Sequence, residues 1–238
     1  MFGTRRAHAL VACSAALVVL VAVGCAGTTG SEDGTGGVRT AEIAAASGDR
    51  ALAARINLVL DDLPGGWSQL PTDTNPIDEL WNCLRPARSR RTVTADVTSH
   101  RFGRGPMRIA VSQTTIFATP EEAASAFERA SADDLGQCIA MRVGSARRPG
   151  DQPRLAEIRA DELAFPSLGE GSVAYRVTGT VEARGATWNW FLDLVLVQRD
   201  RALAVLIAGD APAPFPAKLE RRLARIIEAR MEPGAVAL

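Results

Sequence analysis

Hydrophobic and polar residues alternate along much of the chain, and this period of two predicts β-strands. In residues 107–117, Ile109 and Val111 alternate with Ala110 and Ser112, so one face of this strand is expected to be wetter than the other. We expect strands over 92–102, 107–117, 139–146, 154–161, 172–182, 186–198 and 202–208, with turns at 103–106 and 199–201.

Residues 42–60 end in an apolar stretch that leads into a turn motif. Ile56–Leu60 is followed by Asp62-Leu63-Pro64-Gly65-Gly66-Trp67. Pro-Gly pairs are typical of turns between elements, so this pattern predicts a strand that enters a tight turn. Trp67 is expected to fold back onto the core.

Three segments show the helical period instead. In residues 120–131 Thr119 is a suitable N-cap, a proline occupies the first helical position, and Glu122 is placed to complete a capping box. Residues 76–85 open with a proline and group their apolar side chains on one face, and residues 215–230 carry a second apolar stripe. Together with the strands, these helices predict a single α+β domain, an antiparallel β-sheet with helices packed on one face.

Residues 1–25 have the layout of an export signal. Two arginines precede an apolar run, Ala9–Val23, which is short for a bilayer crossing. The run ends Ala22-Val23-Gly24-Cys25, which resembles the lipobox of bacterial lipoproteins. This resemblance implies cleavage after Gly24 and a diacylglyceryl thioether on Cys25, often with a further acyl chain. A plain secretory signal and an uncleaved anchor helix are the alternatives.

The sequence predicts four segments along the chain. Residues 1–24 would be the lipoprotein signal peptide, and 25–41 the lipidated cysteine with a Gly/Ser/Thr-rich flexible tether. The α+β domain would cover 42–231, with a loose tail at 232–238. Two or more acyl chains hold a protein essentially permanently, so we expect a lipid-anchored location on the outer face of the cell membrane.

The charge of the chain limits the classes of partner that it is expected to bind. Lys plus Arg and Asp plus Glu both number 27, so the net charge is zero, and no long basic run is present. Nucleic-acid binding is therefore not expected, because it depends on basic side chains that neutralise phosphates. Membrane lipid, reached through acylated Cys25, is the expected partner.

The cysteines indicate a disulfide bond. Cys13 lies in the signal and Cys25 is the lipidation site, which leaves Cys83 and Cys138 in the mature domain. An exported pair most simply forms a disulfide. A metal site would need further ligands, yet His100 is the mature domain's one histidine. A redox pair would favour a Cys-x-x-Cys spacing, which is absent.

Catalytic signatures are also absent. No Gly-x-Ser-x-Gly elbow, His-Glu-x-x-His pair or phosphate-binding loop occurs. The adjacent acidic pairs, such as Asp61-Asp62 and Glu121-Glu122, have local explanations at turns and helix ends. We therefore expect no enzyme, cofactor or metal, and a hydrolase that uses His100 is the least favoured hypothesis.

Several of these features occur together in a known family. They are Asp62–Trp67, Cys83 after a short helix, the strand end Gln113–Phe117, the helix start Thr119–Ala123, and Cys138. The pattern resembles actinobacterial exported lipoproteins related to the PknH-like extracellular sensor domain of mycobacterial serine/threonine kinases, over roughly residues 55 to 230. The resemblance implies an extracytoplasmic binding or sensing module without a catalytic centre.

Aromatic residues are the candidate ligand contacts. Trp81, Tyr175, Trp188 and Trp190 could line a pocket for a small molecule, a lipid or a cell-wall fragment, because aromatic faces stack on sugars and apolar tails. Core packing is the competing interpretation. A structural or protein-partner-binding envelope lipoprotein is the alternative function, with a basic patch at Arg88, Arg90 and Arg91.

Overall fold

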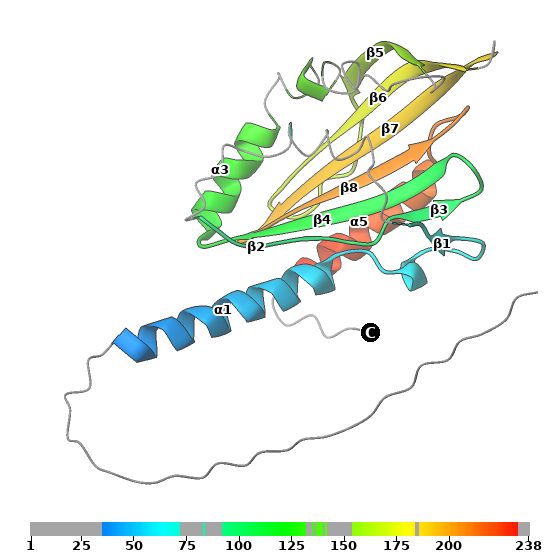
Figure 1. Cartoon of the computed structure of the whole chain (residues 1–238). Coiled ribbons are helices and arrows are strands. Elements are labelled where there is room, and N and C mark those ends of the chain that lie inside the picture. Colours follow the sequence, from blue (N-terminus) through cyan, green and yellow to red (C-terminus); the bar gives the residue numbers. More distant parts are fainter. Residues whose placement is uncertain are drawn as a thin grey trace, which may run out of the picture.

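The computed structural model describes residues 35–71, 92–131, 154–183 and 186–232, together with Cys83, Leu135, residues 137–139 and Met141. The described strands form an 8-stranded sheet in the order β1-β3-β4-β8-β7-β6-β5, with β2 also paired to β4 (Figure 1). They are β1 (Ser68–Gln69), β2 (Val93–Thr98), β3 (Phe102–Arg104), β4 (Arg108–Phe117), β5 (Arg154–Glu162), β6 (Gly171–Ala183), β7 (Ala186–Arg199) and β8 (Ala202–Asp210).

Every described strand pair is antiparallel, which confirms the predicted sheet type. The strands expected at 154–161, 172–182, 186–198 and 202–208 correspond to β5, β6, β7 and β8. The expected turn between the last two lies at Asp200, whose φ of 49° places it in the left-handed region. Long runs of strand-forming residues, separated by turn residues, were sufficient to locate this half of the sheet.

The predicted strand 92–102 is broken in two. β2 and β3 both pair with β4, and the chain between them bends at Ser99. The Ser99 backbone N–H donates to the Ser112 carbonyl, and the Ser99 hydroxyl accepts from the Ser112 N–H, each at 2.8 to 2.9 Å. The serine side chain thus takes a place in the ladder that a backbone carbonyl would otherwise occupy.

Helices cover both faces of the sheet, so the prediction of helices on one face was wrong. Helices α1 (Thr35–Ile56) and α5 (Ala217–Met231) pack on one face, here called the α1–α5 face, against Ala110, Val195 and Leu206. Helix α3 (Pro120–Ala130) packs on the other, the α3 face, against Phe117 and Leu203. Figure 1 shows α3 on the opposite side of the sheet from α1 and α5.

The central strands carry apolar side chains on both faces, so both faces of the sheet are buried. In β7, Leu192, Leu194 and Leu196 lie on the α3 face, while Val195 and Val197 lie on the α1–α5 face. Successive side chains of a strand point to opposite faces, so a continuous apolar run requires a cover on both. All of β8 is buried for the same reason.

The strand predicted over 42–60 was also wrong, because this segment begins as the C-terminal part of α1. Helix α1 runs from Thr35, within the expected tether, to Ile56, and a 3-10 helix, η1 (Leu60–Asp62), follows. The apolar spacing of Ile56 and Leu58 resembles a strand, yet both are buried at a helix end. Trp67 is buried as predicted, with its ring centroid 6.1 Å from that of Phe215.

A buried polar network fixes the end of α1 to the sheet. The Asn57 amide donates to the Val97 carbonyl at 2.7 Å, and its oxygen accepts from the hydroxyls of Ser112 and Thr114 at 3.1 and 2.9 Å. The Ser112 hydroxyl in turn accepts from the Leu58 N–H at 2.9 Å. The polar side chains of this network therefore have partners, which offset the cost of their desolvation.

Helices α3 and α5 confirm the predictions for 120–131 and 215–230. Thr119 caps α3, accepting from the Glu122 N–H at 3.3 Å, while the Glu122 carboxylate accepts from the Thr119 N–H at the same distance. Leu223 and Ile227 of α5 are buried in the core of the α1–α5 face. No helix in the described parts of the chain is long and apolar enough to span a bilayer.

A disulfide joins Cys83 to Cys138, as predicted, across 55 positions of sequence. Cys83 packs against the core of the α3 face. Residues 137–139 and Met141 are helical where a strand was expected over 139–146; the remainder of that segment, and all of the predicted helix 76–85 except Cys83, lie outside the described residues.

Candidate functional site

The predicted aromatic residues of β6 and β7 lie on one face of the sheet. Tyr175 is paired with Leu194, and Trp188 and Trp190 are paired with Val181 and Gly179. All three aromatic side chains belong to the α3 face, because their positions alternate with those that face α1 and α5. Trp81 lies outside the described residues, so its placement stays a prediction.

Tyr175 has a structural role. Its side chain is buried, and its hydroxyl donates to the Ser131 carbonyl, at the C-terminal end of α3, at 3.0 Å. Buried tyrosines normally find such a partner for the hydroxyl. The ring thus packs in the core while its tip fixes the end of α3, and neither part is presented to a ligand.

Trp188 and Trp190 are half-buried. Trp190 packs against the core of the α3 face together with Ile158, and its partner across the ladder is Gly179, which offers no side chain to cover the indole. Both tryptophan side chains remain partly accessible. The two indoles lie two positions apart on one face of β7.

The close approach of β5 favours glycine at position 179. A Cβ added to Gly179 would lie 3.2 Å from the Ala156 carbonyl oxygen and 3.3 Å from the Ile158 side chain. β5 bulges here, with a register shift between Ala156 and Arg159 and a positive φ of 52° at Glu157. Bulges redirect strands and end regular pairing. This bulge brings β5 over the position opposite Trp190.

The sheet narrows at the same end. β7 pairs with β8 only from Phe191, which is opposite Asp210, whereas its pairing with β6 continues to Ala186. Residues 186–190 of β7 therefore extend beyond β8, and the chain leaves β8 through a cis Ala211–Pro212 bond. Trp188 and Trp190 belong to this overhang.

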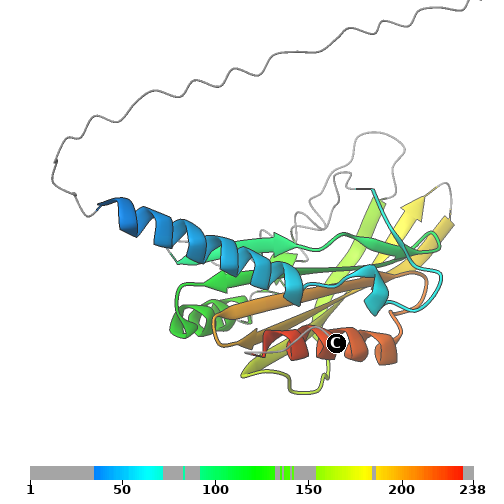
Figure 2. The same cartoon turned by 90° about the horizontal axis from the view of Figure 1, so that it is seen from below.

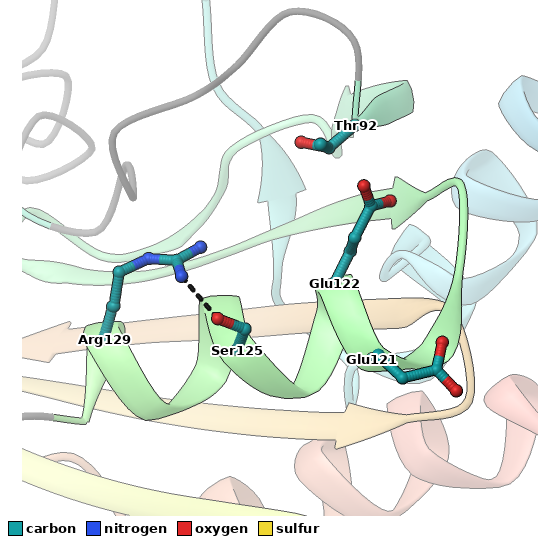
Figure 3. A pocket seen from close by; sticks show the side chains of 5 residues that line it. All are labelled: Thr92, Glu121, Glu122, Ser125 and Arg129. Atoms are coloured by element: carbon teal, nitrogen blue, oxygen red, sulfur yellow. Dashed lines mark hydrogen bonds between the residues drawn. The ribbon is translucent and has the colours of Figure 1, made fainter.

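A separate surface cavity of about 270 Å³ lies beside α3 (Figure 3). Its lining residues are Thr92, Glu121, Glu122, Ser125 and Arg129. All but Thr92 belong to α3, and Figure 3 shows the Arg129 guanidinium turned along the helix to Ser125, to which it donates at 2.5 Å. None of the predicted site residues lines this cavity.

The polar groups of this cavity stabilise α3 itself. The Glu122 carboxylate is used by the capping box. Hydrogen bonds from the Glu121 backbone N–H and the Thr119 side chain lower the pKa of Glu121, as expected of a carboxylate in a first helical turn. The cavity is accounted for by helix capping, and it supplies no nucleophile paired with a base.

A charged cluster is buried beneath α5, and sequence reasoning did not find it. Arg176 of β6 makes a bidentate contact to Asp193 of β7 at 2.6 and 2.7 Å, and Asp193 is fully buried. Glu220, in the first turn of α5, is also buried, and its Oε1 has no hydrogen-bond partner among the described residues. Burial, and secondarily the charge of Asp193, raise the pKa of Glu220 to about 8.

This cluster contains two carboxyl groups and a single described arginine partner. With Glu220 protonated, the charges of Arg176 and Asp193 balance, so the neutral acid is the form that the core accommodates. The signal in the sequence is an acidic residue on the inner side of an amphipathic helix, between Leu219 and Leu223. Such an isolated residue cannot be distinguished from a surface acid by pattern alone.

The remaining candidates are peripheral. His100 is exposed, and its Nδ1 lies 2.8 Å from the Gln69 amide nitrogen. Within the part of the chain that the structure describes, no group of His, Cys, Asp or Glu side chains could hold a metal ion. Cys25 and the arginines at 88, 90 and 91 lie outside the described residues.

Comparisons with known proteins show a structural likeness to an extracellular domain. No protein-family model matches the chain. No curated protein matches it in sequence either. The extracellular domain of PknH from Mycobacterium tuberculosis is similar in structure, with a TM-score of 0.41 and 10% identity, over 76% of this chain and 95% of that domain. At this TM-score the function has to be argued from the chain's own residues.

Proposed function

We propose that this protein is a membrane-anchored extracytoplasmic lipoprotein, and that its domain is a non-catalytic binding or sensor-like module for a small molecule, a lipid or a cell-wall component. The Cys83–Cys138 bridge is the observation that carries the location. Disulfides persist in oxidising compartments, so a bridged domain behind an export signal belongs outside the cytoplasm.

The anchor is argued from residues 1–25. Charge, apolar length, a small residue and a cysteine follow one another in the order that lipoprotein processing requires. Acylation at Cys25 would leave the domain on the outer face of the membrane.

Mass spectrometry of the protein extracted from membranes tests the anchor. We expect an N-terminal peptide that begins at acylated Cys25, and we expect a Cys25→Ala variant to leave the membrane fraction. An unmodified Cys25 in membrane-extracted protein, or unchanged fractionation of the variant, would contradict lipid anchoring.

The binding role rests on Trp188 and Trp190. Their half-buried indoles share one face of an overhanging part of the sheet, which leaves aromatic surface open to a ligand. Aromatic rings at such positions bury large areas on contact, and their edges and faces suit sugars and acyl chains.

A pair of variants distinguishes a ligand contact from core packing. Protein purified without denaturation is expected to carry a small molecule that Trp188→Ala/Trp190→Ala loses. Phe191→Ala provides the matched control, because Phe191 is also half-buried in β7 but points to the opposite face. Equal retention of the co-purifying molecule by both variants would contradict the role of the tryptophans.

The overhang of β7 supports a second candidate, an envelope lipoprotein that binds a protein partner. Residues 186–190 carry no charged side chain and extend past the end of β8. An unprotected strand edge is a template for an added strand. A peptide that protects the amide hydrogens of 186–190 from exchange would favour this alternative.

A further inference from the structure

The layer formed by α1 and α5 presents a basic surface. Both helices bury their inner sides in one core on the same sheet face, so their outer sides face the same way (Figure 2, α1 in blue and α5 in red). Among the described residues, the two helices carry five exposed basic side chains, Arg50, Arg55, Lys218, Arg222 and Arg225.

Most acidic side chains of this layer are neutralised internally. Three of these acids form ion pairs, Asp49 with Arg201 at 2.6 Å, Asp62 with Arg230 at 2.6 Å and Glu228 with Arg199 at 3.1 Å. A fourth, Glu220, is buried beneath α5. Asp61 is exposed beside η1. The outward-facing charge of the described part of the layer is therefore strongly positive, although the chain as a whole has no net charge.

Two apolar side chains project next to the basic residues. Val59 and Leu60 are 47% and 42% exposed, and they lie at the start of η1, shortly after α1 ends at Ile56. The Arg222 guanidinium donates to the Asp62 carbonyl at 3.2 Å, which fixes η1 against the basic side of α5. The exposed basic side chains of α1 and α5 and the exposed apolar side chains at η1 are together called the basic-apolar surface.

We propose that the basic-apolar surface, Arg50, Arg55, Val59, Leu60, Lys218, Arg222 and Arg225, binds the anionic phospholipid headgroups of the membrane to which the chain is tethered. Basic side chains near such a membrane attract its negative surface potential, and apolar side chains insert at the headgroup boundary. Helix α1, which begins ten positions after Cys25, belongs to this surface.

The choice of a membrane as the partner of this surface rests on the proposed anchoring at Cys25, because a tethered chain meets the bilayer before any other partner. Its test can nevertheless be separated from the anchor. The mature chain from residue 25 with Cys25→Ser contains every described residue and has no acyl group. Any binding of this chain to vesicles must come from the protein surface.

Vesicle flotation measures the binding. We expect the Cys25→Ser mature chain to bind phosphatidylcholine vesicles that contain about a quarter phosphatidylglycerol, and not vesicles of phosphatidylcholine alone. Lys218→Glu/Arg225→Glu should weaken binding at least tenfold, because one basic residue near an anionic surface contributes about fivefold. Binding should also fall as salt is added.

Arg129→Glu/Arg159→Glu is the matched control. It changes the net charge equally, but these exposed arginines lie on α3 and β5. The control should bind like the parent chain, and Leu60→Ser should bind more weakly at low and high salt alike. Equal loss in both charge variants, equal binding to neutral vesicles, or no binding to any vesicle would overturn the proposal and leave the surface to a protein or wall polymer.

Failure here and failure of the proposed anchor give different results. Unmodified Cys25 with intact vesicle binding would remove the anchor and keep the surface, whereas acylated Cys25 without vesicle binding would do the reverse.

Discussion

Glu220 is the residue whose environment departs most from that of an ordinary acid. Burial raises its pKa to about 8, with a contribution from the charge of Asp193, while Arg176 and Arg221 act in the opposite direction. The folded state therefore binds a proton that the unfolded chain releases above its ordinary value of 4.5. Stability from this group is complete below the unfolded pKa and is lost as the pH rises towards the folded one.

Substitution of Glu220 by Gln should remove this dependence. Between pH 5 and 8 the wild type is expected to lose stability by up to about 1.4 kcal/mol per pH unit, and the variant should lose less. Urea unfolding at the two pH values measures the difference. Asp61→Asn, at an exposed acid, is the control. Parallel pH profiles for wild type and Glu220→Gln would contradict a proton-linked Glu220.

Single residues also explain where prediction from sequence failed. The apolar spacing that ends in Leu60 indicated a strand, but Asn57 ends the helix by bonding to the sheet, a contact made across 40 or more positions. Trp188 shares a period with the buried leucines of β7, and Tyr175 shares one with the buried Val177 of β6, so pattern alone could not separate the accessible ring from the buried one. The end of α1 and the burial of the Tyr175 ring both depend on partners that are distant in the sequence.

At the scale of elements, α1 is fastened by an ionic contact in its C-terminal half. Arg201, in the turn after β7, contacts Asp49 through two nitrogens at 2.6 and 3.1 Å, and it also donates to the Phe117 carbonyl. The hydrogen bond from Arg201 lowers the pKa of Asp49, with a further contribution from Thr94. The turn, β4 and α1 are thereby connected at one point.

Loss of this contact should loosen α1. Because the pKa of Asp49 is depressed on folding, its contribution is present above the unfolded value of 3.8 and disappears as the pH falls through the folded one. Asp49→Asn should cost about 1 to 2 kcal/mol at pH 7, a range reduced for the partial exposure of Arg201, and less near pH 2.

Chemical denaturation measures the cost, and hydrogen exchange locates it. Faster exchange is expected in α1 and at the β7–β8 turn, with α3 unchanged. Uniform acceleration across the sheet, or the same loss of stability at both pH values, would contradict a local ionic fastening.

Elements with local signals were predicted well. The capping box identifies helix α3 in the sequence. Strand-forming runs separated by turn residues identify β5 to β8. Helix α1 has no comparable N-terminal signal, and the allocation of helices to the two faces depends on packing that no local pattern specifies. The antiparallel α+β class was therefore predictable from the chain, while the second helical cover was not.

At the scale of the whole molecule, the Cys83–Cys138 bond closes a loop that contains β2, β3, β4 and α3. Closing a loop with a sequence separation of 55 constrains the unfolded chain by about 4 kcal/mol in the chain-entropy estimate. Cys83→Ser/Cys138→Ser should lower the free energy of unfolding by an amount of this order.

Thermal unfolding of the double variant, with the reduced wild type beside it, measures this contribution. The two should melt at similar temperatures, both well below the oxidised protein. An unchanged melting temperature on reduction would mean that the bridge constrains neither state.

The short distance along the chain from Cys25 to the start of α1 has a consequence for binding at the bilayer. Ten positions allow a span of at most about 35 Å, so an acylated chain could never carry the first turn of α1 farther than that from its own lipid. Within so small a volume, attraction between headgroups and protein becomes intramolecular, at an effective concentration of order millimolar. A contact too weak to retain the free domain would then be enough to orient the anchored one.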